Sequence, residues 1–180
     1  MNIINVATRI ELREWLQKNH LLAGDGWVYI TKIPYLDIVL ECLCFGWIDS
    51  TKKRVDDGTV QRISPRRKGG NWTELNFERV RRLEKMGLMT EQGRNVLPDR
   101  FAEDFVISPK LETVLRSDAT LWEQFCKLPS LYQRVRLDNI QNLLPKQIEL
   151  YEQRLEKFIL HTREGKLYGD WNDGGKLVDY

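Results

Sequence analysis

The order of apolar and polar residues changes period several times along the first third of the chain. Residues 9–19 carry apolar side chains on one helical face, and Thr8 with Glu11 before them has the form of a capping box. Residues 27–33 are aromatic and β-branched, which indicates a strand. Residues 35–45 are apolar on nearly every side, which is typical of a buried helix.

A hairpin is predicted next, because two strand-like segments flank the sequence Asp-Asp-Gly at residues 56–58. The segments span residues 47–54 and 59–65, and Asp-Gly tolerates the positive φ angles of a tight hairpin turn. Lys and Arg fall on both faces, so we expect the hairpin to be exposed on at least one face. A helix capped by Asn71 should follow and end at Gly87.

The remainder of the chain has a helical pattern. Ser108 and Asp118 are suitable N-cap residues, and Pro129 and Pro145 each stand where a further helix would begin. Residues 167–180 form a polar, glycine-containing tail that would become ordered only by docking.

Together these patterns predict an α+β fold. Residues 1–98 should form a small antiparallel sheet with packed helices, including the basic hairpin, and residues 108–166 a helical C-terminal subdomain. With the tail at residues 167–180, the chain is expected to form one compact unit.

Composition narrows the class of protein. The 180 residues are 42% apolar and 30% charged, an ordinary globular balance, and no apolar run approaches the length of a membrane helix. Residues 1–10 lack the pattern of a signal peptide, and Cys42 and Cys44 are too close for an easy disulfide, which indicates a cytoplasmic protein with reduced thiols. Neither His20 nor His161 has partners at metal-ligand spacing, so we expect no metal and no cofactor.

Charge is sorted along the chain. Between residues 52 and 82, ten Lys or Arg stand against four Asp or Glu, so this segment carries +6 and the rest about −4. Guanidinium groups bind phosphate or carboxylate, and indole rings offer stacking faces. The predicted ligand-binding residues are Trp47, Arg62, Arg66, Arg67, Trp72, Asn76 and Arg79, with Asp49 and Asn76 orienting the arginines. The alternative is a solvated hairpin whose arginines pair with Asp49, Asp56, Asp57, Glu74 and Glu78.

Signals for catalysis are weak. Asp49 could act as a general base, or simply accept backbone hydrogen bonds, and Cys44 could be a nucleophile, or a buried inert thiol. The common phosphate-binding, zinc-protease and serine-hydrolase motifs are absent.

One set of motifs carries a family resemblance. The sequence CFGWID at residues 44–49, with QR-x-x-PR at residues 61–66, resembles the YdeI/OmpD-associated, or bacteriocin-protection-type, family. The resemblance covers residues 10–97 and extends more loosely to the helical part, where Leu143 and Ile148 replace two basic residues typical of the family. It implies a cytoplasmic bacterial protein linked to tolerance of bacteriocins or antimicrobial peptides.

We therefore predict a non-enzymatic cytoplasmic binding protein that recognises an anionic small molecule or an acidic partner through an Arg/Trp surface. Two alternatives stay open at this point. One is an enzyme acting on a phosphate-bearing small molecule, and the other is sequence-independent binding of nucleic acid, which is possible but less favoured.

Overall fold

The structure, a computed structural model, describes residues 1–180, and their contacts divide them into two units. The first unit comprises Met1–Trp72 and Glu78–Phe101, and the second comprises Thr73–Phe77 and Ala102–Tyr180. The sequence pattern did not indicate that the short segment at residues 73–77 packs with the second unit. The expectation of one compact body stays a prediction.

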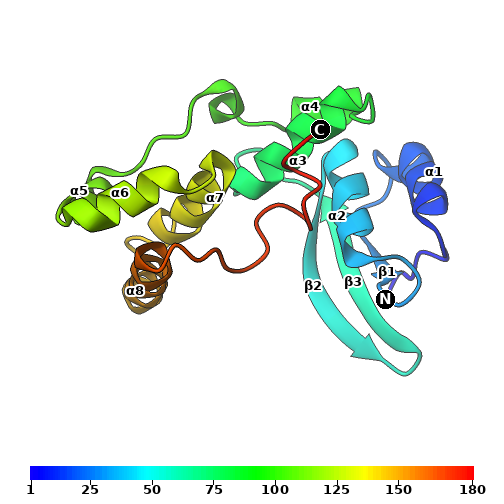
Figure 1. The fold of residues 1–180 in the computed structure, drawn as a ribbon. Coiled ribbons are helices and arrows are strands. Elements are labelled where there is room, and N and C mark those ends of the chain that lie inside the picture. The colour runs from blue at the N-terminus through cyan, green and yellow to red at the C-terminus, as the bar shows by residue number, and fades with distance from the viewer. The chain divides into compact units, whose positions relative to one another are not determined.

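The first unit is built on a three-stranded antiparallel sheet (Figure 1). Its elements, including two that continue into the second unit, are α1 (Arg9–Asn19), β1 (Gly26–Tyr29), α2 (Tyr35–Cys44), β2 (Trp47–Val55), β3 (Gly58–Pro65), α3 (Glu74–Lys85), α4 (Glu91–Asn95) and the 3-10 helix η1 (Asp99–Ala102). The strand order is β1-β3-β2, so the predicted hairpin forms the pair β2–β3 and β1 joins its β3 edge. Strand β1 is shorter than predicted because the amides of Lys32 and Ile33 donate to Tyr29 O and turn the chain.

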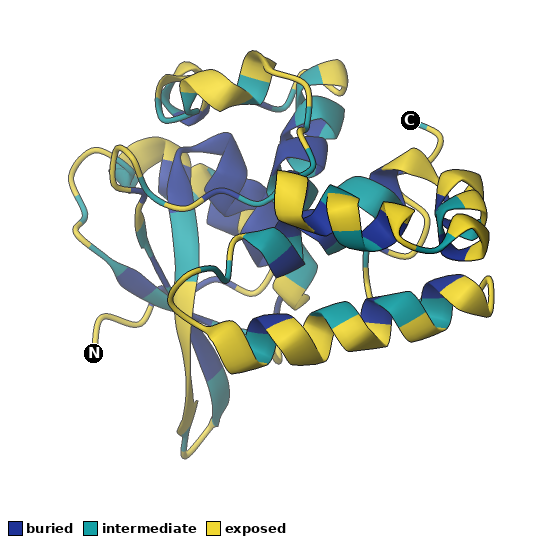
Figure 2. Ribbon diagram, turned by 90° about the vertical axis from the view of Figure 1, so that its left-hand side faces the viewer, coloured by how far each residue is buried: buried dark blue, intermediate teal, exposed yellow.

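Helix α2 lies at the centre of this unit. Every residue from Ile38 to Cys44 is buried, because α2 packs against β2 on one side and contacts α1 and α4 on others (Figure 2). Gly93 in α4 permits the close approach, since a Cβ there would lie 2.8 Å from Leu43 O and closer still to Cys44 O. Gly46 ends α2 with a φ of +70°, in the left-handed region that favours glycine.

The helix starts follow the predicted capping chemistry in part. Thr8 Oγ1 accepts from Glu11 N at 3.2 Å, and the Glu11 carboxylate accepts from Ala7 N at 2.7 Å, which together complete the start of α1. The prediction for α3 was wrong in detail. Thr73, and not Asn71, caps this helix, because Thr73 Oγ1 accepts the hydrogen bond from Asn76 N at 3.2 Å.

The second unit is helical, as predicted. It contains α5 (Pro109–Arg116), α6 (Ala119–Lys127), α7 (Ser130–Gln141) and α8 (Ile148–Arg163). Ser108 and Asp118 cap α5 and α6 through their side chains. Helix α8 begins three residues after Pro145, because Gln147 has a non-helical backbone and separates the helix from the preceding turn.

The core of the second unit gathers side chains from all four helices, including Leu111, Phe125, Tyr132 and Phe158. The C-terminal segment docks on α7 of the same unit: Leu177 is buried there, and the Trp171 ring lies edge-on to Tyr132 at 5.5 Å. These observations confirm the α+β class, with a small antiparallel sheet followed by a helical subdomain. None of the helices combines the length and the apolar character that crossing a membrane requires.

Candidate functional site

Arg62, predicted to bind a ligand, is already paired. Its guanidinium lies 2.8 Å from the Asp25 carboxylate, and both side chains are a little over one-third exposed. The pair ties β3 to the loop before β1, where Arg62 stands opposite Trp27 in the register. The alternative interpretation of the basic segment expected its arginines to pair with carboxylates. Arg62 does so, but its partner is Asp25 and not one of the acids named there.

Arg66 and Trp72 do come together, but inside the protein. The Arg66 guanidinium lies 3.9 Å from the Trp72 ring centroid, and the two residues are only 6% and 2% exposed. Arg66 Nη1 donates to Asn71 O at 2.8 Å, while its Nε is buried without a partner. Burial lowers the pKa of Arg66, and the charge of Asp49 opposes this effect. The stack therefore fixes the chain after β3, and its ring faces are not open to a ligand.

The remaining predicted binding residues lie in different environments. Trp47 is 1% exposed, donates from Nε1 to His20 O at 3.2 Å and packs edge-on against Trp15, so it belongs to the core. Arg67 is exposed on the loop after β3. Asn76 lies in the segment that belongs to the second unit.

Asp49 has a partner that the sequence analysis missed. The Tyr35 hydroxyl donates to Asp49 Oδ2 at 2.6 Å, and the Lys52 ammonium lies 4.7 Å from the Tyr35 ring centroid. Burial raises the pKa of Tyr35, the hydrogen bond and charge of Asp49 raise it further, and the charge of Arg79 acts in the opposite direction. Arg79 itself belongs to α3, and Asp49 serves as an acceptor that joins α2 to β2.

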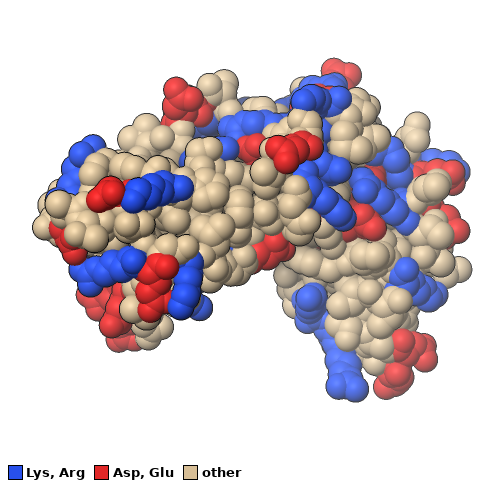
Figure 3. Space-filling model, viewed as in Figure 1, with Lys and Arg blue, Asp and Glu red and all other residues tan.

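Beyond Asp49, the hairpin carries cations that face water. Lys52, Lys53, Arg54, Arg67 and Lys68, called here the hairpin cations, are all exposed and none forms an ion pair. The sheet register places three of them in the outer half of β2, opposite residues 59–61 of β3. Figure 3 shows blue Lys and Arg side chains and red acidic side chains close together at the far end of the hairpin. The hairpin thus offers positive charge that no carboxylate of the fold pairs with, although Lys52 also contacts the Tyr35 ring.

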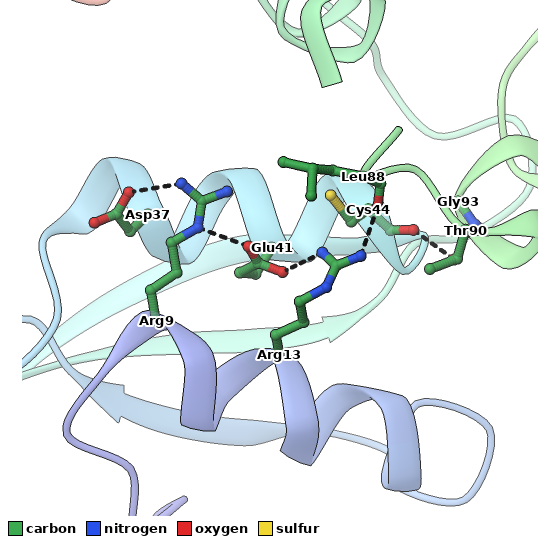
Figure 4. A network of polar contacts seen from close by, with 8 residues as sticks. All are labelled: Arg9, Arg13, Asp37, Glu41, Cys44, Leu88, Thr90 and Gly93. Atoms are coloured by element: carbon green, nitrogen blue, oxygen red, sulfur yellow. Dashed lines mark hydrogen bonds and ion pairs between the residues drawn. The ribbon is translucent and has the colours of Figure 1, made fainter. Parts of the chain in front are cut away.

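A second charged cluster, centred on the buried Glu41, was not predicted (Figure 4). The Glu41 carboxylate is 1% exposed and accepts from Arg9 Nε at 2.7 Å and from Arg13 Nη1 at 2.9 Å. Arg13 also donates to Leu88 O at 2.7 Å, and Arg9 contacts Asp37 at 3.2 Å. The sequence contains a signal for this cluster. Arg9 and Arg13 are four residues apart, as are Asp37 and Glu41, and this spacing places each pair on one face of its helix.

Cys44 lies beside this cluster. Burial raises the pKa of the Cys44 thiol to about 11, the charge of Glu41 adds to this, and Arg13 opposes it. Burial also raises the pKa of Cys42. Since the thiolate is the reactive form, these two side chains have the environment of inert thiols near neutral pH. No group of three or more His, Cys, Asp or Glu side chains is placed to hold a metal ion.

The three thiols are therefore expected to react at different rates. At pH 8, a chromogenic disulfide reagent should modify exposed Cys126 rapidly, and Cys42 and Cys44 only after unfolding in guanidinium chloride. Absorbance of the released thiolate gives the number of fast and slow groups. Cys126→Ser should abolish the fast phase, and a second fast thiol in the folded protein would contradict the burial of α2.

These features define a class of protein: a two-unit α+β protein whose first unit holds a buried carboxylate–arginine cluster and presents a basic hairpin. The chain belongs to the family described as a domain of unknown function (DUF8412), whose model matches residues 4–96. Residues 104–165 match the family model described as bacteriocin-protection, YdeI or OmpD-associated.

The second match confirms the family that the sequence resemblance named. Its location differs from the expectation, because the match lies on the helical part and not on residues 10–97. No curated protein and no solved structure matches the chain.

Proposed function

We propose that this protein is a non-enzymatic, cytoplasmic bacterial protein that binds an acidic protein partner through the hairpin cations. The observation that carries the proposal is that these five exposed side chains form no ion pair within the fold. Unpaired surface charges contribute little to the stability of a fold, whereas they steer and orient an oppositely charged partner.

The charge of the whole first unit supports this proposal. It contains seventeen Lys or Arg against twelve Asp or Glu, a net charge of +5, whereas the second unit has eleven against fourteen, a net charge of −3. Several of the arginines of the first unit are used internally, including Arg9, Arg13, Arg62 and Arg66. The cations that remain for a partner are concentrated on the hairpin and the loop that follows it.

The geometry favours a protein partner over nucleic acid. The two indoles that could have stacked on bases, Trp47 and Trp72, are buried. Asp56 and Asp57 are exposed at the hairpin tip and interrupt the positive face. Their negative charges would repel the phosphates of a nucleic-acid backbone. An acidic protein surface can instead place its carboxylates opposite individual cations.

The biological role that we attach to this binding comes from the family description. The match of residues 104–165 to a family named for bacteriocin protection supports a role in tolerance of bacteriocins or antimicrobial peptides. In this proposal the hairpin docks an acidic component of that response.

A charge reversal on the hairpin tests the proposal. Fluorescence anisotropy would follow binding of labelled poly-glutamate, as a model acidic chain, at low salt to wild type, Lys53→Glu and Lys18→Glu. Lys18 is an exposed cation on α1 and gives the same change in net charge. We expect Lys53→Glu to weaken binding about fivefold, roughly 1 kcal/mol, and Lys18→Glu less than twofold.

Three results would count against this function. They are no binding by wild type, equal weakening by both variants, and tighter binding of an oligonucleotide of matched charge. The last of these would replace the acidic protein partner with nucleic acid.

A further inference from the structure

The second unit contains a cavity of about 310 Å³, and none of its lining residues belongs to the hairpin. Its lining residues come from α7, α8 and the segment after α8, and they are Arg136, Asn139, Ile140, Arg154, Lys157 and Tyr168. Three of these six side chains are cationic and none is acidic. Such a lining is notable in a unit whose net charge is −3.

Arg136 is held in place at one wall of the cavity. Its guanidinium lies 4.6 Å from the Tyr168 ring centroid and 5.4 Å from that of Tyr132, and it donates to the backbone carbonyl of Tyr168. Gly169, with a φ of +67°, makes room for it, since a Cβ there would lie 2.6 Å from Arg136 Nη2. Arg136 Nε is buried and has no hydrogen-bond partner. The guanidinium is thus fixed before any ligand arrives, which lowers the entropic cost of binding.

Arg154 and Lys157 contribute the other two charges from one face of α8. Arg154 Nη1 donates to Asn139 O at 2.8 Å, and the Lys157 ammonium lies 4.9 Å from the Tyr168 ring centroid. Burial raises the pKa of Tyr168, and the charges of Arg136 and Arg154 oppose that effect.

The three cations differ from others in the same unit. Arg116, Lys127, Arg134, Arg163 and Lys166 each form an ion pair with a carboxylate. Arg136, Arg154 and Lys157 form none, although they are close enough to share one cavity. Like charges gathered without a counter-charge repel one another, and a bound anion would relieve that repulsion.

We propose that this cavity is a binding site for the phosphate group of a small molecule. The guanidinium groups of Arg136 and Arg154 and the ammonium of Lys157 would donate to the phosphate oxygens. Asn139 adds an amide at the wall, and the half-buried Tyr168 adds a ring edge beside which a small organic part could lie. A volume near 310 Å³ is at the lower end for small-molecule sites, so the ligand is a small phosphorylated compound or phosphate itself.

The test uses the full-length protein and three probes: inorganic phosphate, adenosine monophosphate and uncharged adenosine. We expect isothermal titration calorimetry to show saturable binding of the monophosphate and none of adenosine. Lys157→Gln and Arg154→Gln, both at exposed positions, should each weaken binding at least fivefold. Lys146→Gln, an exposed cation that does not line this cavity, should change it less than twofold.

The probes also separate the two sources of the phosphate. Equal affinity for inorganic phosphate and the monophosphate would assign the cavity to free phosphate, and tighter binding of the monophosphate would assign it to an organic phosphate. Absence of saturable binding of both, or equal loss in Lys146→Gln, would overturn the proposal. Lys53→Glu in the hairpin should leave this binding unchanged, so the result does not depend on the function proposed for the first unit.

Discussion

Glu41→Gln is expected to lower the free energy of unfolding of the first unit by about 3 kcal/mol, because it breaks a buried ion pair on one side only. The variant keeps the shape of the side chain but removes the charge that faces Arg9 and Arg13, which lie 2.7 and 2.9 Å away. Both arginines are about one-third exposed and can turn partly to water, which keeps the loss at the lower end of the range for buried pairs.

Glu84→Gln provides the matched control for this variant. Glu84 pairs with Arg94 at 2.7 Å, but the two side chains are 33% and 49% exposed, so the loss of stability should be much smaller than for Glu41→Gln. Urea unfolding followed by tryptophan fluorescence measures both variants. If they unfold at the same urea concentration, the Glu41 cluster does not contribute to stability in the way that its burial implies.

Gly93→Ala should destabilise the first unit by a similar amount, about 3 kcal/mol, for a steric reason. Alanine in a helix ordinarily gains about 1 kcal/mol over glycine, so helix propensity alone predicts the opposite sign. The added Cβ would lie 2.8 Å from Leu43 O and closer to Cys44 O, and these are backbone atoms of α2 that cannot rotate away. Helix α4 would have to move off α2, which would also strain the bond from Thr90 Oγ1 to Cys44 O.

The control for this substitution is Gly24→Ala. A Cβ at Gly24 would meet nothing within 4 Å and its φ is not in the left-handed region, so the change should be neutral or slightly stabilising. Urea midpoints of the two variants decide the matter. If the Gly93→Ala and Gly24→Ala variants were equally stable, α4 would not pack against α2 as closely as the structure shows.

The parts of the fold that the sequence predicted well are those set by local chemistry. The Asp-Asp-Gly turn defines the β2–β3 hairpin, and the unbroken apolar run defines α2, because neither needs information from elsewhere in the chain. The side-chain caps of Thr8, Ser108 and Asp118 likewise act within three residues. The order β1-β3-β2 depends on a long-range pairing, and no local pattern specified it.

The candidate site was harder to predict, because closeness in sequence does not determine which way a side chain points. Trp47 and Trp72 were selected as neighbours of the basic segment, yet large aromatic side chains bury readily and both lie in the interior. Arg62 paired with Asp25, thirty-seven residues away, which a search among nearby acids could not reveal. The exposed charge of the hairpin, by contrast, followed from the absence of clear alternation in β2.

The cavity in the second unit could not have been inferred from spacing alone. Its cations come from α7 and α8, and its position depends on Tyr168 and Gly169, which follow the last helix and have no regular secondary structure. Only the packing of these three segments brings Arg136, Arg154 and Lys157 together. The local sequence offered one partial indication, the placement of Arg154 and Lys157 away from the apolar stripe of α8.

The position of Tyr168 has a thermodynamic consequence for the end of the chain. Trp171 and Leu177 anchor the last residues on α7, and the same segment forms one wall of the cavity. Any molecule bound in the cavity beside Arg136 and Tyr168 would therefore favour the anchored form of this segment, and release of the segment would weaken binding of that molecule by the same factor. Occupancy of this cavity and protection of residues 168–180 against proteases would then vary together.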